Sequence, residues 1–333
     1  MKLRLKFIFP LVAGLALSGC SFISITDSSK EEDITKITGS YYEGYNLNKT
    51  GDKLLAELQR NCWEKHTKYV AYGQFNSYCV KTKDHGNIEA ISQGSEVAQL
   101  FYTGKEQVGT YQNSSGAIST SREHVWPCSK SASLWEHYKD KTTDHPHNVD
   151  LAKSGVEVYV GGGSDLYHVR LCGYYTNSDR SNDRFVSFTD EEHMAYAGGV
   201  KEVKDSGGKW SLKVNAGQQT CEPANEMKGD IARIVTYVYL HYSNRGITPS
   251  GSFSLDYASG RVYKYEDMVG SLVLTDVMGY PTEDRCKEVL KAWNKLDPPN
   301  EVEKARNNTV QKIQGNRNPF VDFPELIDQA FSY

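Results

Sequence analysis

The chain has 333 residues, of which 38% are hydrophobic and 24% charged, and its mean hydropathy is −0.58. This composition excludes a protein with several membrane spans, and an aromatic content of 11% excludes a low-complexity disordered chain. The net charge is −4, so binding to a polyanion requires a local basic site rather than a global positive field. We therefore expect a folded globular protein.

Residues 1–20 have the features of a targeting signal. Lys2, Arg4 and Lys6 precede the apolar run FIFPLVAGLAL, which is too short to span a bilayer. The segment ends in Leu-Ser-Gly-Cys, which resembles the cleavage box of bacterial lipoproteins, and this resemblance implies that Cys20 is lipidated. A plain secretory signal is the alternative. Removing this segment, with its three basic and no acidic side chains, leaves 35 basic and 42 acidic residues and a net charge of −7.

Residues 21–40 are rich in Ser, Thr and acidic residues and lack an apolar period, so we expect a flexible tether there. One domain is then predicted over residues 41–333. Outside the cytosol an even number of cysteines is compatible with up to three disulfide bonds, and free buried thiols are the alternative. After Cys20 the cysteines are Cys62, Cys79, Cys128, Cys172, Cys221 and Cys286.

Hydrophobic periodicity predicts three helices. Residues 50–63 place Leu55, Leu58 and Cys62 on one face, and residues 225–242 carry the clearest apolar stripe of the chain. A third helix is expected over residues 283–296, before a Pro-Pro pair. The region between residues 80 and 121 is polar and contains Gly and Ser, which favours loops and short strands. No internal repeat is evident, so we expect a single mixed unit in which helices dominate.

The first candidate site is the segment REHVWP at residues 122–127. Adjacent residues of a strand point to opposite faces, but at a strand end Glu123 and His124 can approach one centre. A carboxylate is a hard ligand suited to Mg²⁺, and a neutral imidazole is a general base near pH 7. The alternative is a chance Glu-His pair in a chain that has nine histidines.

Two further segments follow, DLYHVR at residues 165–170 and NSDRSN at residues 177–182. The second is typical of a turn that enters a helix. Asn177 or Ser178 then serves as an N-cap, and this is the structural alternative to a functional role.

Taken in this order, REHVWP, DLYH and NSDRSN resemble the bacterial endonuclease I family of periplasmic or secreted nonspecific nucleases. The resemblance continues in KGDIAR at residues 228–233 and IQGNRNPF at residues 313–320, and it covers about residues 41–325. It implies an α+β fold, with a His-Me finger (ββα-metal) core embedded in a mostly helical single domain.

The resemblance also implies roles for individual residues. His124 is the general base that activates water, and Glu123 and Asn177 hold one Mg²⁺ ion, for which Ca²⁺ or Mn²⁺ can substitute. Arg180 follows Asn177 by one helical turn, so we expect it to act in catalysis by contacting phosphate, with a surface arginine as the alternative. Cleavage is expected to leave 5′-phosphate and 3′-hydroxyl ends.

The chain departs from the family pattern at Tyr167, where many members have His, and at Leu171, where Pro is usual. Basic residues expected to contact phosphates are Arg122, Lys312 and Arg317. The last two belong to residues 303–318, which hold four basic side chains and one acidic side chain. A solvated helix face is the alternative for that stretch.

A loop with the sequence DHPH, from Asp144 to His147, invites a transition-metal hypothesis, although a polar turn is the more economical interpretation. The leading hypothesis is a monomeric, Mg²⁺-dependent, sequence-nonspecific nuclease of DNA, with RNA as a second substrate. It would act outside the cytoplasm, anchored to a bacterial membrane through Cys20. Two alternatives are a surface lipoprotein that binds nucleic acid without turnover and a phosphoesterase of small substrates.

Overall fold

The computed structural model of the chain describes residues 40–70, 72–108, 120–130, 161–245, 252–255, 262–264 and 269–332. Backbone contacts divide the chain into two units, Met1–Glu43 and Gly44–Tyr333. Only residues 40–43 of the first unit are described, so the predicted signal, Cys20 and most of the predicted tether lie outside the described residues. The second unit holds all the elements named below. Among the described helices, none combines the length and apolarity needed to cross a bilayer.

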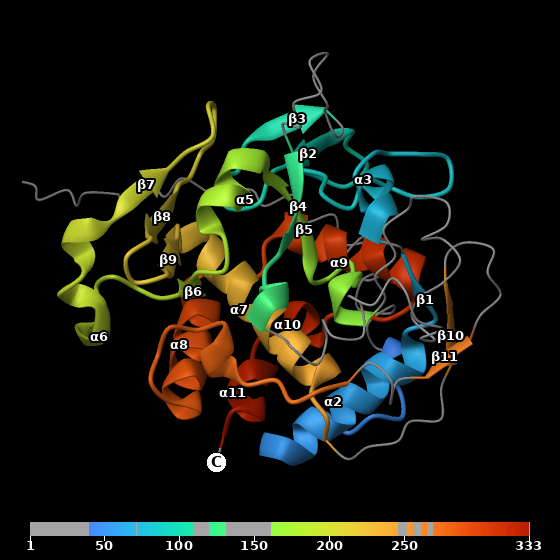
Figure 1. Ribbon diagram of the computed structural model, residues 1–333. Coiled ribbons are helices and arrows are strands. Elements are labelled where there is room, and N and C mark those ends of the chain that lie inside the picture. Colours follow the sequence, from blue (N-terminus) through green and yellow to red (C-terminus); the bar gives the residue numbers. More distant parts are fainter. Residues whose placement is uncertain are drawn as a thin grey trace, which may run out of the picture. The chain divides into compact units, whose positions relative to one another are not determined.

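The three predicted helices are present, with nearly the predicted bounds. They are α2 (Gly51–Lys65), α7 (Asn225–Tyr242) and α8 (Glu283–Leu296). The apolar positions that predicted them are buried, except Tyr239, which is partly buried. Helix α7 runs through the middle of the unit and packs against both α2 and α8 (Figure 1), which explains why it is buried on nearly every side.

The C-terminal region contains helices whose bounds the sequence did not predict. They are α9 (Glu301–Gln314), α10 (Pro319–Asp322) and α11 (Leu326–Ala330). Helix α9 begins where the Asn300 side chain accepts a hydrogen bond from the backbone N–H of Glu303. Both carboxylate oxygens of Glu303 accept hydrogen bonds from Arg233 of α7, at 2.7 and 2.6 Å. This buried pair joins α9 to the central helix.

Short strands form several small sheets. A four-stranded sheet has the order β6 (Arg184–Phe185), β9 (Thr220–Pro223), β8 (Leu212–Asn215), β7 (Lys201–Val203). Strand β2 (Val97–Gln99) pairs with β3 (Glu106–Val108), and a third sheet has the order β1 (Lys68–Tyr69), β10 (Ser252–Leu255), β11 (Val262–Lys264). The remaining short helices include α3 (Phe75–Tyr78) and α6 (Glu191–Met194). The fold is therefore of the α+β type, as predicted.

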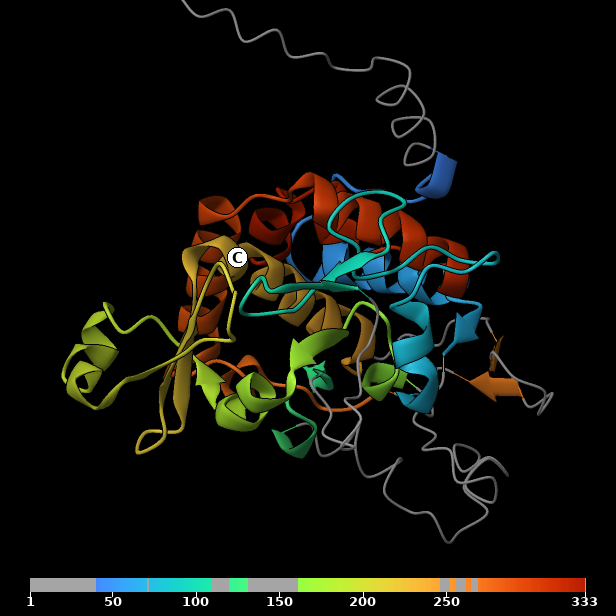
Figure 2. The same ribbon diagram turned by 90° about the horizontal axis from the view of Figure 1, so that it is seen from above.

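The candidate site lies on a strand pair followed at once by a helix. Strand β4 (Thr120–His124) pairs antiparallel with β5 (Val169–Gly173) over five residues, and α5 (Tyr174–Arg180) begins at the next residue. Helix α5 packs against both strands. Figure 2 shows this hairpin between α5 on one side and α9 on the other. The predicted DHPH loop falls in residues 131–160, outside the described residues.

The prediction of disulfide bonds is wrong for the cysteines whose side chains are described. Five thiols are free and buried, namely Cys62, Cys79, Cys172, Cys221 and Cys286. They belong to different elements of the core, where a thiol packs like a small apolar side chain. Burial raises the pKa of the thiol of Cys221 to about 12, so it stays protonated and unreactive at neutral pH. The side chain of Cys128 lies outside the described residues.

Candidate active site

The alternation of strand β4 divides its side chains between two faces. Glu123 contacts α5, as does Ser121 two residues earlier, whereas Arg122 and His124 both contact Tyr72. Glu123 and His124 thus leave the strand in opposite directions, close to its C-terminal end. The sequence predicted this divergence. That both side chains can approach one centre at the strand end stays a prediction.

Glu123 is 2% exposed and is held by two donors. The hydroxyl of Tyr102 donates a hydrogen bond to its Oε1 at 2.7 Å, and Arg180 Nη1 lies 3.3 Å from the same oxygen. Burial raises the pKa of the Glu123 carboxyl, while Arg180 and the Tyr102 hydrogen bond oppose that rise. The carboxylate is an oxygen donor of the kind that Mg²⁺ prefers.

Arg180 is 1% exposed, which corrects its predicted role as a side chain that contacts phosphate. Its guanidinium donates to the backbone oxygens of His124 at 3.3 Å and Val125 at 2.6 Å, in addition to pairing with Glu123. A buried guanidinium with these partners is not available to a substrate. Arg180 instead fixes the end of β4, and both Glu123 and His124 depend on that position.

Asn177 lies one turn before Arg180 on α5 and is partly buried. Its Nδ2 donates to Ser121 Oγ at 2.7 Å and to the backbone oxygen of Arg122 at 3.4 Å. Ser121 and Glu123 share a face of β4, so these bonds hold Asn177 on the same side of the strand as Glu123. With Nδ2 committed to β4, Oδ1 is the atom that can ligate a cation. A carboxylate and an amide oxygen together fit a hard divalent ion.

His124 is held in one tautomer. Its Nε2 lies 2.8 Å from the backbone oxygen of Gly163, and because a carbonyl oxygen only accepts, Nε2 carries the proton. The lone pair is therefore on Nδ1. The Tyr72 ring stacks on the imidazole with centroids 4.9 Å apart and an interplanar angle of 15°. Burial, followed by the neighbouring His168, lowers the pKa of His124 to about 3, so the imidazole is neutral at physiological pH.

His168 holds two backbone segments near His124, the one that follows His124 in the chain and the glycine turn that His124 contacts. Its Nε2 accepts a hydrogen bond from the backbone N–H of Trp126 at 2.9 Å, and its Nδ1 donates to the backbone oxygen of Gly162 at 2.5 Å. The consecutive backbone oxygens of Gly162 and Gly163, in one glycine turn, thus accept hydrogen bonds from two histidines. Gly161 opens this turn with φ +68°, a conformation that favours glycine.

The two departures from the family pattern have structural roles. Tyr167 is buried, and its hydroxyl donates to the backbone oxygens of Asn307 at 3.1 Å and Asn316 at 3.0 Å, which ties the start of β5 to the C-terminal region. Leu171 is fully buried and pairs in register with Arg122. The β4–β5 pairing continues through this position.

The three predicted phosphate contacts lie in different environments. Arg122 packs over the Tyr72 ring, 4.0 Å from its centroid, on the face of β4 that carries His124. Lys312 is exposed on α9. Arg317 is 1% exposed and binds Asp322 with Nε at 2.7 Å and Nη2 at 2.6 Å, so its predicted phosphate contact is corrected to a structural ion pair.

A second group with metal-binding side chains lies in the core. Nitrogen and oxygen atoms of His66, Asp165 and His241 lie within 4.8 Å of one another, and all three residues are buried. His66 Nδ1 is 3.3 Å from His241 Nε2. Asp165 accepts four hydrogen bonds, from the hydroxyls of Tyr237 and Tyr242, the amide of Gln314 and the backbone N–H of Tyr167. A carboxylate has about four acceptor positions, so this arrangement favours a buried hydrogen-bond network over a metal site.

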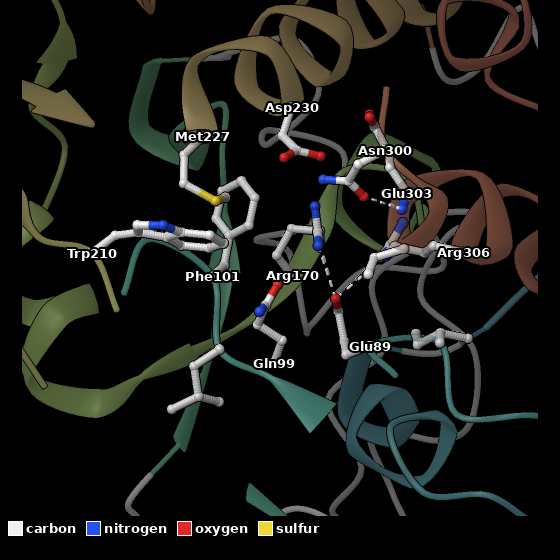
Figure 3. A pocket seen from close by; sticks show the side chains of 13 residues that line it. Glu89, Gln99, Phe101, Arg170, Trp210, Met227, Asp230, Asn300, Glu303 and Arg306 are labelled. Carbon is white, nitrogen blue, oxygen red and sulfur yellow. Dashed lines mark hydrogen bonds and ion pairs between the residues drawn. The ribbon is translucent and has the colours of Figure 1, made fainter. Parts of the chain in front are cut away.

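Figure 3 shows a hollow between β5, α7 and α9, lined by the aromatic rings of Phe101 and Trp210 and by charged side chains. Glu89 receives hydrogen bonds there from Arg170 at 2.9 and 3.0 Å and from Arg306 at 3.3 Å. The interior volume is about 20 Å³, which suffices for one or two water molecules. The hollow is therefore too small for a nucleotide.

Sequence reasoning missed two tyrosines and a glycine that build the site. Tyr72 and Tyr102 lie far from β4 in sequence, and nothing in their local pattern marks the contacts with His124 and Glu123. Gly163 belongs to a run of three glycines, which signals a special backbone without revealing its partner. His168 lay within the DLYH motif and carried a visible signal, but no role was predicted for it.

Comparison with known proteins identifies the family of the chain. The Endonuclease I family profile matches residues 50–325, and the chain belongs to that family. It is therefore a nuclease. Two relatives are named extracellular ribonucleases. That of Bacillus subtilis (strain 168) is 27% identical over 298 residues, covering 88% of this chain and 79% of the relative. That of Bacillus amyloliquefaciens is 26% identical over 296 residues, covering 88% and 78%.

Proposed function

We propose that the protein is a divalent-cation-dependent, sequence-nonspecific endonuclease whose β4–β5 pair and α5 form a His-Me finger. The observation that carries the proposal is the tautomer of His124, in which Nε2 is bound to the Gly163 carbonyl and the basic lone pair is on Nδ1. Glu123, on the opposite face of the same strand end, and Asn177, on the adjoining helix α5, would hold one Mg²⁺ ion, for which Ca²⁺ or Mn²⁺ can substitute.

The reaction is hydrolysis of a phosphodiester. His124 Nδ1 takes a proton from water as the water oxygen forms a bond to phosphorus, and the bond from phosphorus to the 3′ oxygen breaks. A second water protonates the 3′ oxygen, which leaves 5′-phosphate and 3′-hydroxyl ends. The metal, when bound, stabilises the negative charge on the phosphate and the leaving oxygen. Tyr72 and Gly163 hold the imidazole plane, and Arg180 and Tyr102 hold Glu123.

The proposed substrates are DNA and RNA. Two relatives carry the name ribonuclease, and contacts to the phosphate backbone do not distinguish bases. Arg122, beside His124, and the exposed Lys312 are the proposed phosphate contacts, and the protein is proposed to act as a monomer. The relatives are named extracellular, which supports a site of action outside the cytoplasm. Lipidation of Cys20 would attach the protein to a bacterial membrane, with residues 21–40 as a tether.

The test is degradation of plasmid DNA and of RNA by the purified protein with Mg²⁺. We expect fragments with 5′-phosphate ends, loss of activity in EDTA, and loss of activity in His124→Ala with an unchanged circular dichroism spectrum. His85→Ala is the matched control, because His85 also bonds a backbone carbonyl and stacks on a tyrosine, Tyr78. Cleavage that survives His124→Ala would contradict the proposal.

The same assay separates the proposal from a nucleic-acid-binding lipoprotein without turnover. The contacts that already surround the Glu123 carboxylate are the observation that favours this second candidate. Retention of intact plasmid in the presence of Mg²⁺ or Mn²⁺ would support it. Cleavage of a mononucleotide diester but not of polymer would instead indicate a phosphoesterase of small substrates.

A further inference from the structure

Helix α5 exposes two consecutive aromatic rings at its start. Tyr174 is 48% exposed and Tyr175 is 75% exposed, and their rings meet edge to face with centroids 5.4 Å apart. Among the described residues, one other aromatic side chain is exposed to a similar degree, Tyr196 at 46%, and it stands alone. Exposed rings gathered at one place are a common mark of a binding surface.

One of the two rings, that of Tyr174, lies next to the proposed metal ligand. In a helix, residues three apart are neighbours on the surface, so Tyr174 lies beside Asn177. Thr176 and Arg180 form the buried side of α5 and attach it to the protein, which leaves the tyrosines on its outer side. The Tyr174 ring therefore borders the place where a phosphate would approach Asn177, and the Tyr175 ring, which contacts it, extends the aromatic surface away from that place.

We propose that Tyr174 and Tyr175 form a stacking platform for unpaired bases of the nucleic-acid strand that is cut at His124. The proposal rests on the proposed function and adds a substrate class, namely single strands and unpaired loops. Every base has a π-face, so stacking on tyrosine holds a strand without reading its sequence. In a duplex the faces of internal bases are covered by their neighbours, so the platform discriminates against duplex.

The surroundings favour a nucleic acid over a membrane or a protein partner. The neighbouring residue Ser178 is exposed, and Asp179 pairs with Lys201 at 3.2 Å. Two rings bordered by such polar groups do not form the extended apolar surface that an interfacial helix or a protein interface requires. Single strands are held by stacking rings beside basic side chains, and Lys201 is a basic side chain near these rings.

The test is equilibrium binding of a fluorescein-labelled oligothymidylate to the full chain in EDTA, followed by anisotropy. We expect the dissociation constant to rise about tenfold in Tyr174→Ala and in Tyr175→Ala. Tyr174→Phe and Tyr175→Phe keep the ring and should bind like the wild type. Tyr196→Ala is the matched control and should also bind like the wild type.

Salt dependence and a duplex provide the second readout. Stacking involves no phosphate charge, so the alanine variants should keep the wild-type slope of log Kd against log salt concentration, and should bind duplex as the wild type does. Wild-type affinity in both alanine variants would overturn the platform. An equal loss on duplex, or a changed salt slope, would also overturn it, because either indicates a displaced α5.

This assay distinguishes the platform from the catalytic proposal. Weakened single-strand binding in a protein that cuts nothing would support the platform and refute the nuclease mechanism. If the wild type cuts single strands and both alanine variants bind them normally, the platform is refuted and the nuclease mechanism is not. A further outcome is that the wild type binds phosphatidylglycerol vesicles in a way that depends on the two tyrosines, while its binding of oligothymidylate does not depend on them. That result would overturn the platform in favour of a membrane contact.

Discussion

Replacing Glu89 by glutamine removes the one carboxylate that both Arg170 and Arg306 bind. Burial alone would raise the pKa of Glu89, but the two guanidinium groups lower it overall, so the residue is ionised in the folded protein. Its side chain is almost fully buried, and it also accepts a hydrogen bond from the backbone N–H of Leu171 in β5 at 3.2 Å. In Glu89→Gln two buried cations lose their counter-ion.

Breaking a buried ion pair from one side costs about 3–5 kcal/mol. The melting entropy is about 2.1 cal/mol/K per residue, which amounts to about 0.6 kcal/mol/K for a domain of this size. We therefore expect the melting temperature of Glu89→Gln to fall by about 5–8 °C. The matched control is Glu106→Gln, which makes the same chemical change in the exposed pair with Lys209 and should alter stability by less than about 0.5 kcal/mol.

The assay is thermal unfolding at pH 7, repeated at lower pH. The pKa of Glu89 is lowered in the folded state, so its contribution is present above its unfolded pKa and is lost as the pH falls through the folded value. The difference between wild type and Glu89→Gln should therefore shrink in strong acid. Equal melting temperatures for the two glutamine variants at pH 7 would show that Glu89 does not stabilise the fold through its two buried arginines.

Three further predictions concern other buried groups. Burial lowers the pKa of His66 to about 4. Between about pH 6.5 and 4 the unfolded chain therefore binds a proton at this residue that the folded chain does not, which destabilises the wild type. The stability difference between wild type and His66→Gln should narrow as the pH falls through this range. A constant difference would contradict this. His168→Ala should lower kcat by about 10- to 100-fold while KM changes little, because it displaces the glycine turn that orients His124; a change in KM alone would argue against positioning. Dithiothreitol should leave the melting temperature unchanged, because the described thiols are free, whereas a reduced structural disulfide would cost about 2–4 kcal/mol.

Local patterns predicted the helices well because their apolar faces repeat with the helical period. The bounds of α7 and α8 agree with the predicted ranges because Thr282 caps α8 and the apolar stripe defines α7. The disulfide bonds were wrongly expected, because an even count of cysteines carries no information on whether thiols meet. Each described thiol, such as Cys62 in α2, fills a separate place in the core.

The sequence offered candidate residues for the site but not the contacts that hold them. Motif order singled out Glu123, His124 and Asn177. The structure places Glu123 and Asn177 at the junction of β4 and α5, whereas the His124 side chain contacts Tyr72 and Gly163 on the other face of the strand. Arg180 and Arg317 were expected to face phosphate, because a sequence does not show that a carboxylate will pair with an arginine and be buried with it. Their partners, Glu123 and Asp322, become evident only when the chain has folded.

The most direct test of the proposed centre is the anomalous diffraction of Mn²⁺ soaked into crystals of the protein. We expect one manganese peak in contact with a carboxylate oxygen of Glu123 and with Oδ1 of Asn177. A peak among His66, Asp165 and His241, with none between Glu123 and Asn177, would contradict this expectation.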